Sequence, residues 1–288
     1  MNESNRASNY SIRSVRSYAI LVIWSVVVVS PLYWVIITSF KTQIDVTSGP
    51  KFIPWIDFQP TLSAWRNLFG SMDAQWVRAF FNSVIVSLAS SAIALVLAAL
   101  AGYGLARFQV TWWRLKNKDI AFFFIAQRMF PPVALVLPYI LFYKFFHLLD
   151  TRAGLVIAYV GMSIPLGVWI TRDFFGQLPV ELEESAMVDG YTRQQAFRKV
   201  VLPLAAPGLL AAFLVMFIFN WNEYVVALML TVQQAQTMPV FIFATNSSLG
   251  PQWASMSAIA LVAMAPVMMI GIALAKFFDQ ATLAGSFR

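Results

Sequence analysis

The sequence has few of the residues that enzymes most often use for chemistry. It contains no cysteine and a single histidine, His147, among 288 residues. Disulfide frameworks, cysteine-ligated metal sites and two-histidine metal sites are therefore excluded. No phosphate-binding loop of the form G-x-x-x-x-G-K-[ST] and no G-x-S-x-G serine is present. We expect no enzymatic activity, no metal site and no cofactor bound by this chain.

Charged residues are also scarce. Only 11% of the residues are charged and 59% are hydrophobic, whereas a soluble domain has about 25% charged residues and about 45–50% apolar ones. Too few polar side chains remain to cover a water-soluble surface. The composition predicts an all-α integral membrane protein.

Six stretches are long and apolar enough to cross the hydrocarbon as helices, which takes about 20 residues each. They are residues 18–40, the interval between Arg78 and Arg107, residues 120–143, the interval between Arg152 and Arg172, residues 204–230 and residues 253–275. The third stretch is interrupted by Arg128 and by two consecutive prolines. We predict six transmembrane helices within a domain of residues 18–280, an N-terminal segment of residues 1–17 that is retained as part of an anchor, and a tail of residues 281–288.

Basic residues are unevenly divided between the two sides of these spans. One side carries Arg6, Arg13, Arg16, Arg107, Arg114, Lys116, Lys118, Arg172, Arg193, Arg198, Lys199, Lys276 and Arg288. The opposite side carries only Lys41, Lys51, Arg66, Arg78, Lys144 and Arg152. Because loops rich in lysine and arginine stay in the cytoplasm, both termini are predicted to be cytoplasmic. The net charge of +7 is then explained without a nucleic-acid partner.

The fourth loop, residues 177–203, is dense in charge and is predicted to face the cytoplasm. Pro179 suits a first helical turn, and the three glutamates that follow it complement the positive end of a helix dipole. Gly190 suits the left-handed turn that ends a helix, and Thr192 suits the cap of the next one. We therefore predict a helix, a glycine turn and a second helix, with Ala186 and Met187 exposed on the first helix. An interfacial helix on lipid headgroups is the alternative, which the carboxylates disfavour.

The same loop resembles a known family signature. Glu184-Ser185-Ala186, Gly190, Val200 and Leu202-Pro203 have the spacing of the E-A-A-x3-G-x9-I-x-L-P motif of the membrane subunits of binding-protein-dependent ABC importers. Ser185 and Val200 replace an alanine and an isoleucine. Further segments resemble the second permease of maltose-type systems: Arg128-Met129-Phe130-Pro131-Pro132, Asn220-Trp221-Asn222-Glu223, Thr237-Met238-Pro239-Val240 and Thr282-Leu283-Ala284-Gly285.

This resemblance implies a type I importer permease that moves a sugar or sugar-like solute across the inner membrane. Its partners would be a second homologous permease, two cytoplasmic ATPases that bind ATP and magnesium, and an extracytoplasmic solute-binding protein. The first helix of the fourth loop would be a cytoplasmic coupling helix seated in an ATPase cleft. The residues assigned to coupling are Glu183, Glu184, Ser185, Ala186, Asp189, Gly190, Leu202 and Pro203.

Two further sets are candidates for the solute and for its receptor. Ionisable residues within a membrane span are costly unless they face protein or water, so they often mark a pathway. The candidate pathway residues are Gln127, Arg128, Asn220, Trp221, Asn222 and Glu223. Helix pairing is the alternative role for Arg128, and a position near the outer headgroups is the alternative for Glu223. The loop 231–252 contains no charged residue. Its candidate receptor contacts are Asn246, Ser247, Ser248, Leu249 and Gly250.

Two other functions compete with sugar import. An importer permease of another branch, carrying phosphate, peptide or another small polar solute, would share the cytoplasmic motif. A secondary transporter would also explain six spans, but such proteins usually place ionisable residues at mid-membrane, and only Arg128 and Glu223 are available here. The solute itself is not specified by the sequence.

Overall fold

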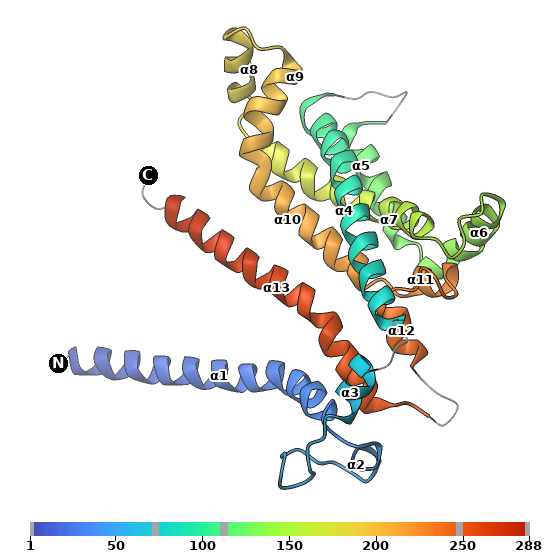
Figure 1. Cartoon of the computed structure of the whole chain (residues 1–288). Helices are drawn as coiled ribbons and strands as arrows, with labels where there is room; N and C mark the ends of the chain where they lie inside the picture. The colour runs from blue at the N-terminus through green and yellow to red at the C-terminus, as the bar shows by residue number, and fades with distance from the viewer. Residues whose placement is uncertain (1–2, 71–74, 110–114, 246–249, 286–288) are drawn as a thin grey trace. The chain divides into compact units, whose positions relative to one another are not determined.

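The computed structural model describes residues 3–70, 75–109, 115–245 and 250–285, and it contains helices but no β-strand within these ranges. Figure 1 shows the helices along the chain. Their bounds are α1 Glu3–Thr38, α2 Gln43–Thr47, α3 Ser63–Gly70, α4 Gln75–Arg107, α5 Asn117–Ala126, α6 Pro132–Phe145, α7 Arg152–Gln177, α8 Glu181–Val188, α9 Arg193–Ala196, α10 Leu202–Trp221, α11 Val225–Leu230, α12 Met238–Ala244 and α13 Trp253–Gly285. A 3₁₀ turn, η1 (Gln127–Met129), and a π-helical turn, η2 (Phe197–Val201), complete the set.

The chain divides into two compact units. Unit 1 comprises residues 1–74 and 242–288, and unit 2 comprises residues 75–241. Each unit is described by itself below.

Five helical segments in the described part of the chain are long and apolar enough to cross a membrane. They are Ser17–Thr38, Gln75–Arg107, Arg152–Gln177, Arg193–Trp221 and Trp253–Ile272. They overlap five of the six predicted spans. The chain is therefore a multi-pass membrane protein with a helical fold.

The predicted third span, residues 120–143, does not form one helix. It divides into α5, the turn η1 and α6, with a break at Phe130 and Pro131. Both of these residues precede a proline and are extended, with ψ angles of 130° and 134°, because the following proline ring disfavours the helical region. The two helices have 10 and 14 residues, so each is shorter than the roughly 20 residues that a crossing needs.

The expected bounds of the fifth span and of the loop after it are also corrected. The span was placed at residues 204–230, but α9, η2 and α10 form a continuous helical segment that ends at Trp221. A separate short helix, α11, follows. The loop 231–252 contains α12.

Helices α4, α7 and α10 form the centre of unit 2 and approach one another through small residues. Gly167 lies against Ala98 and Met216, so a side chain at this position would collide with both. Gly102 lies against Thr171, whose hydroxyl donates a hydrogen bond to the Ala98 carbonyl at 2.9 Å. Small residues and interhelical hydroxyl bonds are what allow helix packing in a membrane, where no hydrophobic force drives it.

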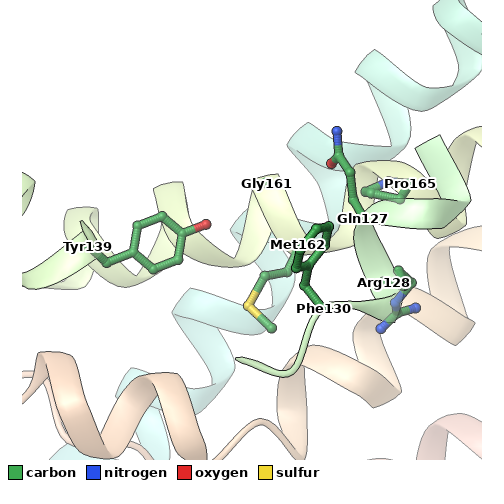
Figure 2. A pocket seen from close by; sticks show the side chains of 7 residues that line it. All are labelled: Gln127, Arg128, Phe130, Tyr139, Gly161, Met162 and Pro165. Carbon is green, nitrogen blue, oxygen red and sulfur yellow. The ribbon is translucent and has the colours of Figure 1, made fainter. Parts of the chain in front are cut away.

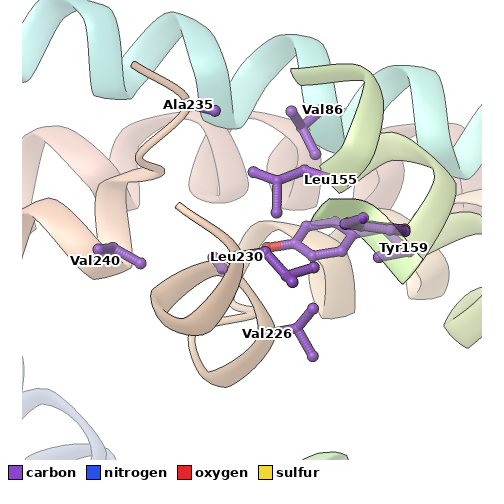
Figure 3. Packing of buried hydrophobic residues seen from close by; sticks show 10 residues of the cluster. Val86, Leu155, Tyr159, Val226, Leu230, Ala235 and Val240 are labelled. Carbon is purple, nitrogen blue, oxygen red and sulfur yellow. The ribbon is translucent and has the colours of Figure 1, made fainter. Parts of the chain in front are cut away.

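A cluster of buried apolar residues joins five parts of unit 2 (Figure 3), and Tyr143 belongs to it from α6. Val86 comes from α4, Leu155 and Tyr159 from α7, and Val226 and Leu230 from α11. Ala235 and Val240 also belong to the cluster and bring residues 231–241 onto the same helices. The segment after α11 is therefore packed against the start of α4 and α7.

Unit 1 contains α1, α2, α3 and α13. Apolar residues along α1 are largely exposed, such as Ile20 and Trp24, each with 67% of its surface accessible. The end of α1 is different, since Lys41 is only 2% exposed. Its ammonium group donates to the Lys51 carbonyl at 2.6 Å and lies 4.2 Å from the centre of the Trp34 ring. Burial lowers the pKa of Lys41 below its ordinary value.

Candidate functional site

The predicted helix, glycine turn and second helix are all present between α7 and α10. Helix α8 ends at Val188, and Gly190 has a φ angle of +90°. The N–H of Tyr191 donates back to the Ala186 carbonyl at 3.1 Å, which closes the helix end. Thr192 caps α9 in a reciprocal pair with Gln195. The local sequence signals for this loop are confirmed.

Glu183 fixes α8 to the end of α4. Its carboxylate accepts a hydrogen bond from Arg107 Nε at 2.5 Å and one from the Tyr103 hydroxyl at 2.7 Å. Arg107 also donates to the carbonyl of Leu178, just before α8, at 2.9 Å. The side chains of Arg107 and Glu183 are 5% and 7% exposed. We call Glu183, Arg107, Tyr103 and the Leu178 carbonyl the inner clamp.

The other residues assigned to coupling divide between two faces of this segment. Ala186 is buried at 6% exposure, contrary to the expectation that it is exposed on α8. The apolar residues that α8 does expose are Leu182 and Val188, at 43% and 87%. Leu202 is half-buried. The other five assigned residues are exposed: Glu184, Ser185, Asp189, Gly190 and Pro203, the last in the first turn of α10.

Gln127 and Arg128 line a cavity of about 400 Å³ at the break between α5 and α6 (Figure 2). Phe130 and Tyr139 also line it, together with Gly161, Met162 and Pro165 of α7. The Arg128 guanidinium lies 4.7 Å from the centre of the Phe219 ring of α10. The cavity therefore offers an amide, a guanidinium and a phenol among apolar and aromatic surfaces.

The other four candidate pathway residues do not join this cavity. Asn220 is 5% exposed and bonds three helices together, because its amide donates to Ser90 and Ser91 at 3.0 Å each and accepts from Ser163 at 2.8 Å. Trp221 is 3% exposed. It packs against Phe80 and Phe217.

Asn222 and Glu223 lie at the break after α10. Asn222 is exposed, and its side chain donates to the Ile218 carbonyl at 2.8 Å. The Glu223 carboxylate accepts from the backbone N–H groups of Val226 and Ala227, each at 3.0 Å, and from the Tyr159 hydroxyl at 3.1 Å. Glu223 thus caps the start of α11, as acidic groups at helix N-termini commonly do.

Four of the five candidate receptor contacts, Asn246, Ser247, Ser248 and Leu249, lie outside the described residues. Gly250 is described and has a φ angle of +103°. It lines a cavity of about 310 Å³ in unit 1, together with Gln43, Asn67 and Gln252.

Asp150 is a structural residue that the sequence did not reveal. Its carboxylate accepts hydrogen bonds of 3.0–3.1 Å from four consecutive backbone N–H groups, those of residues 232–235. Burial alone would raise the pKa of Asp150, but these four N–H groups together outweigh it and lower that pKa below its ordinary value. Because the donors are backbone groups, no residue type in that loop marks the contact.

Asn82 of α4 holds the same loop from the other side. Its amide donates to the carbonyls of Gln234 and Gln236 at 2.8 and 2.9 Å and accepts from Arg152 at 2.7 Å. The next residue, Ser83, accepts from the N–H of Met238 at 2.8 Å. We call Asn82, Ser83, Asp150 and Arg152 the outer clamp.

Residues 94–283 match the sequence profile of the binding-protein-dependent transport system inner membrane component. The chain belongs to this family. The matched region contains the inner clamp, α8 and the cavity at Arg128. The chain is thus a permease subunit of a binding-protein-dependent ABC importer, as the motif in the fourth loop predicted.

Relatives in this permease family cover nearly the whole chain. The diacetylchitobiose uptake system permease protein NgcG of Streptomyces coelicolor is 30% identical, over 94% of this chain and 88% of that protein. The trehalose transport system permease protein SugB of Mycobacterium tuberculosis is 35% identical, over 88% and 89%. A crystal structure of a bacterial ABC transporter that imports alginate matches with a TM-score of 0.71 at 22% identity, covering 96% and 99% of the two chains.

Proposed function

We propose that this permease serves an importer of a sugar or sugar-like solute: an oligosaccharide, a glycoside or a polyol. The observation that carries the proposal is the nearly full-length similarity to permeases named for diacetylchitobiose and for trehalose. A third relative, from Agrobacterium fabrum, is named for sulfoquinovosyl glycerol and is 33% identical over 83% of this chain. All three solutes carry sugar hydroxyl groups.

We assign the coupling to partner ATPases to α8. Its exposed side combines Leu182 and Val188 with the carboxylate of Glu184, a mixture suited to a protein cleft with an apolar floor and a basic rim. ATP and magnesium would bind to those partners, so closure of the ATPase pair would move α8 as a lever. The positive φ angle of Gly190 supports this role because it fixes the turn that follows the lever.

The cavity at Gln127 and Arg128 is our candidate for solute passage. Sugars are recognised by hydrogen-bonding amide, guanidinium and phenol groups and by the faces of aromatic rings, and the side chains of Gln127, Arg128, Phe130 and Tyr139 offer all of these. A volume of about 400 Å³ lies within the range of small-molecule sites, which is roughly 300–1,000 Å³. Asn220 and Trp221 are buried between helices, so we do not include them in this cavity.

The proposed topology has six crossings, with α5 and α6 together providing the third. Both termini would be cytoplasmic, as the distribution of lysine and arginine favours. A second homologous permease and two ATPases would complete the transporter. An extracytoplasmic receptor would deliver the solute near residues 246–250.

Affinity purification from the native membrane tests the assembly. A tagged chain should retain a second permease and an ATPase, identified by mass spectrometry. Recovery of the chain alone, or only with copies of itself, would contradict the importer and favour secondary transport.

The reconstituted complex, with its receptor, then tests the solute class. We expect ATP hydrolysis to rise with members of a panel of disaccharides, glycosides and polyols. Stimulation by phosphate or a peptide instead would assign the chain to another branch of the importers. The Arg128→Gln variant should weaken transport of the active solute, whereas Arg66→Gln, in the predicted external loop of unit 1, should not.

A further inference from the structure

Helix α4 contributes residues to both clamps of unit 2. Tyr103 and Arg107 of the inner clamp are at its end, and Asn82 and Ser83 of the outer clamp are near its start. At roughly 1.5 Å per residue, the helix rises about 37 Å between Asn82 and Arg107. Because the hydrocarbon core of a bilayer is about 30 Å thick, the two clamps lie at opposite faces of the membrane when α4 spans it.

The composition of α4 suits it to act as a stiff rod. Of the five candidate spans in the described parts of the chain, the other four each contain a proline, and α4 contains none. Sharp kinks in helices occur mainly at proline. Close packing of Gly102 against Thr171 and of Ala98 against Gly167 further supports α4 along its length.

The two clamps fasten α4 to separate segments. At the inner clamp, the buried carboxylate of Glu183 connects α4 to α8. At the outer clamp, Asn82 is fully buried and connects α4 to residues 234 and 236, while Asp150 holds residues 232–235 from the start of α7. We call residues 231–237 the outer loop.

We propose that α4 transmits displacement of α8 to the outer loop across the membrane, with Glu183 and Asn82 as the positioning residues at its two ends. This inference rests on the proposed coupling role of α8. A push on α8 would reach α4 through the paired Glu183 and Arg107 and would shift the outer loop by a similar distance. The position of the outer loop, on the side of the membrane where the receptor would bind, would thus depend on whether the ATPase pair is open or closed.

A distance measurement within the single chain tests the rod. The sequence has no cysteine, so spin labels at Val180→Cys and Val232→Cys would be the only ones. Both positions are exposed, at 46% and 71%, and neither side chain belongs to a clamp. In lipid nanodiscs, electron paramagnetic resonance should give one narrow distribution of distances between the two labels.

Variants test whether the contacts of the clamp, rather than the negative charge of α8 in general, fix this distance. Glu183→Gln should broaden or shift this distribution, and Asn82→Leu should do the same from the other end. Glu181→Gln is the matched control, since Glu181 is an exposed acid in the same helix and should leave the distribution unchanged. If Glu183→Gln does not accumulate in the membrane, Tyr103→Phe replaces it, because this change removes only the hydroxyl donor and should produce a smaller broadening.

The complete transporter tests transmission. In the reconstituted complex, Glu183→Gln should reduce solute-stimulated ATP hydrolysis by about tenfold, which is equivalent to about 1.4 kcal/mol in activation free energy. Stimulation in Glu183→Gln equal to that of the wild-type complex, or equal distance distributions in Glu183→Gln and Glu181→Gln, would overturn the inference. A wild-type complex without solute stimulation would count against the proposed function alone. The distance measurement requires no partner subunit, so it would still test whether α4 connects the two clamps rigidly.

Discussion

Two carboxylates of unit 2, Asp150 and Glu183, hold segments together through different kinds of hydrogen-bond donor. Within the described part of the chain, Asp150 accepts hydrogen bonds only from backbone N–H groups of one loop. Glu183 accepts from two side chains of another helix, Arg107 and Tyr103. The first carboxylate organises a loop whatever its side chains are, whereas the second depends on two particular residues far away in the sequence. Substitution at the partner therefore breaks the inner clamp, while the outer loop is sensitive to change at Asp150 itself.

The largest effect is expected for Arg107→Met. This change leaves Glu183 buried without its cation, and the loss of one partner of a buried ion pair costs about 3–5 kcal/mol. Chemical unfolding of the purified chain in detergent measures the loss. The double variant Arg107→Met with Glu183→Leu should recover most of the stability, because no buried charge remains. Equal instability of the single and double variants would show that the ion pair is not the source of the effect.

A smaller effect is expected for Asp150→Asn. The amide has one acceptor oxygen and no charge, so the four N–H groups of the outer loop lose their charged partner, at a cost of about 1–3 kcal/mol. Amide hydrogen exchange of residues 232–235 should become faster. Asp173→Asn, at an exposed acid of α7, is the control and should leave that exchange unaltered.

The pH dependence of the same exchange follows from the lowered pKa of Asp150. A carboxyl group whose folded pKa lies below its ordinary value of 3.8 stabilises the fold fully above that value, and the stabilisation is lost as the pH falls through the folded pKa. Protection of residues 232–235 should therefore stay constant from neutral pH down to about pH 5 and decline only below about pH 4. A decline centred near neutral pH would assign the contact to another group.

The smallest effect of this series is expected for Gly190→Val. No atom lies within 4 Å of the position that a Cβ would take, so the cost is confined to the left-handed backbone and amounts to roughly 1–2 kcal/mol. Solute-stimulated ATP hydrolysis should fall while membrane insertion is retained. Gly176→Ala, in open space on α7 with an ordinary helical backbone, should preserve both. Unchanged coupling in Gly190→Val would remove this turn from the lever.

Local signals in the sequence predicted local structure well. Thr192 and Gly190 marked the cap and the turn around α9, and uninterrupted apolar runs marked five spans. The third stretch, in which the sequence shows the interruption by Pro131 and Pro132, divides into two helices because the two consecutive prolines force two extended residues into the run.

The same local signals did not predict the long-range contacts. Glu183 was assigned to coupling, but its partner Arg107 was counted only as a cytoplasmic loop charge. An amide in an apolar run predicts a pathway residue at Asn220, but it gives no sign that this amide joins α4, α7 and α10. Asp150 gave no signal, since its donors are backbone groups about 80 residues further along the chain. Pairing of distant segments is set by tertiary packing, which no short motif encodes.

The break at Pro131 and Pro132 has a consequence for hydration. In an unbroken helix the carbonyls of Gln127 and Arg128 would accept from the N–H groups four residues later, but prolines occupy both of those positions and have none. The Gln127 carbonyl accepts from the Phe130 N–H at 3.4 Å instead. Lipid tails offer no donor, and an unsatisfied carbonyl in hydrocarbon costs several kcal/mol. The adjoining cavity of about 400 Å³ is large enough to hold several water molecules. The proline pair therefore places backbone carbonyls beside a space where water, or a hydroxyl-rich solute that displaces it, can donate hydrogen bonds to them.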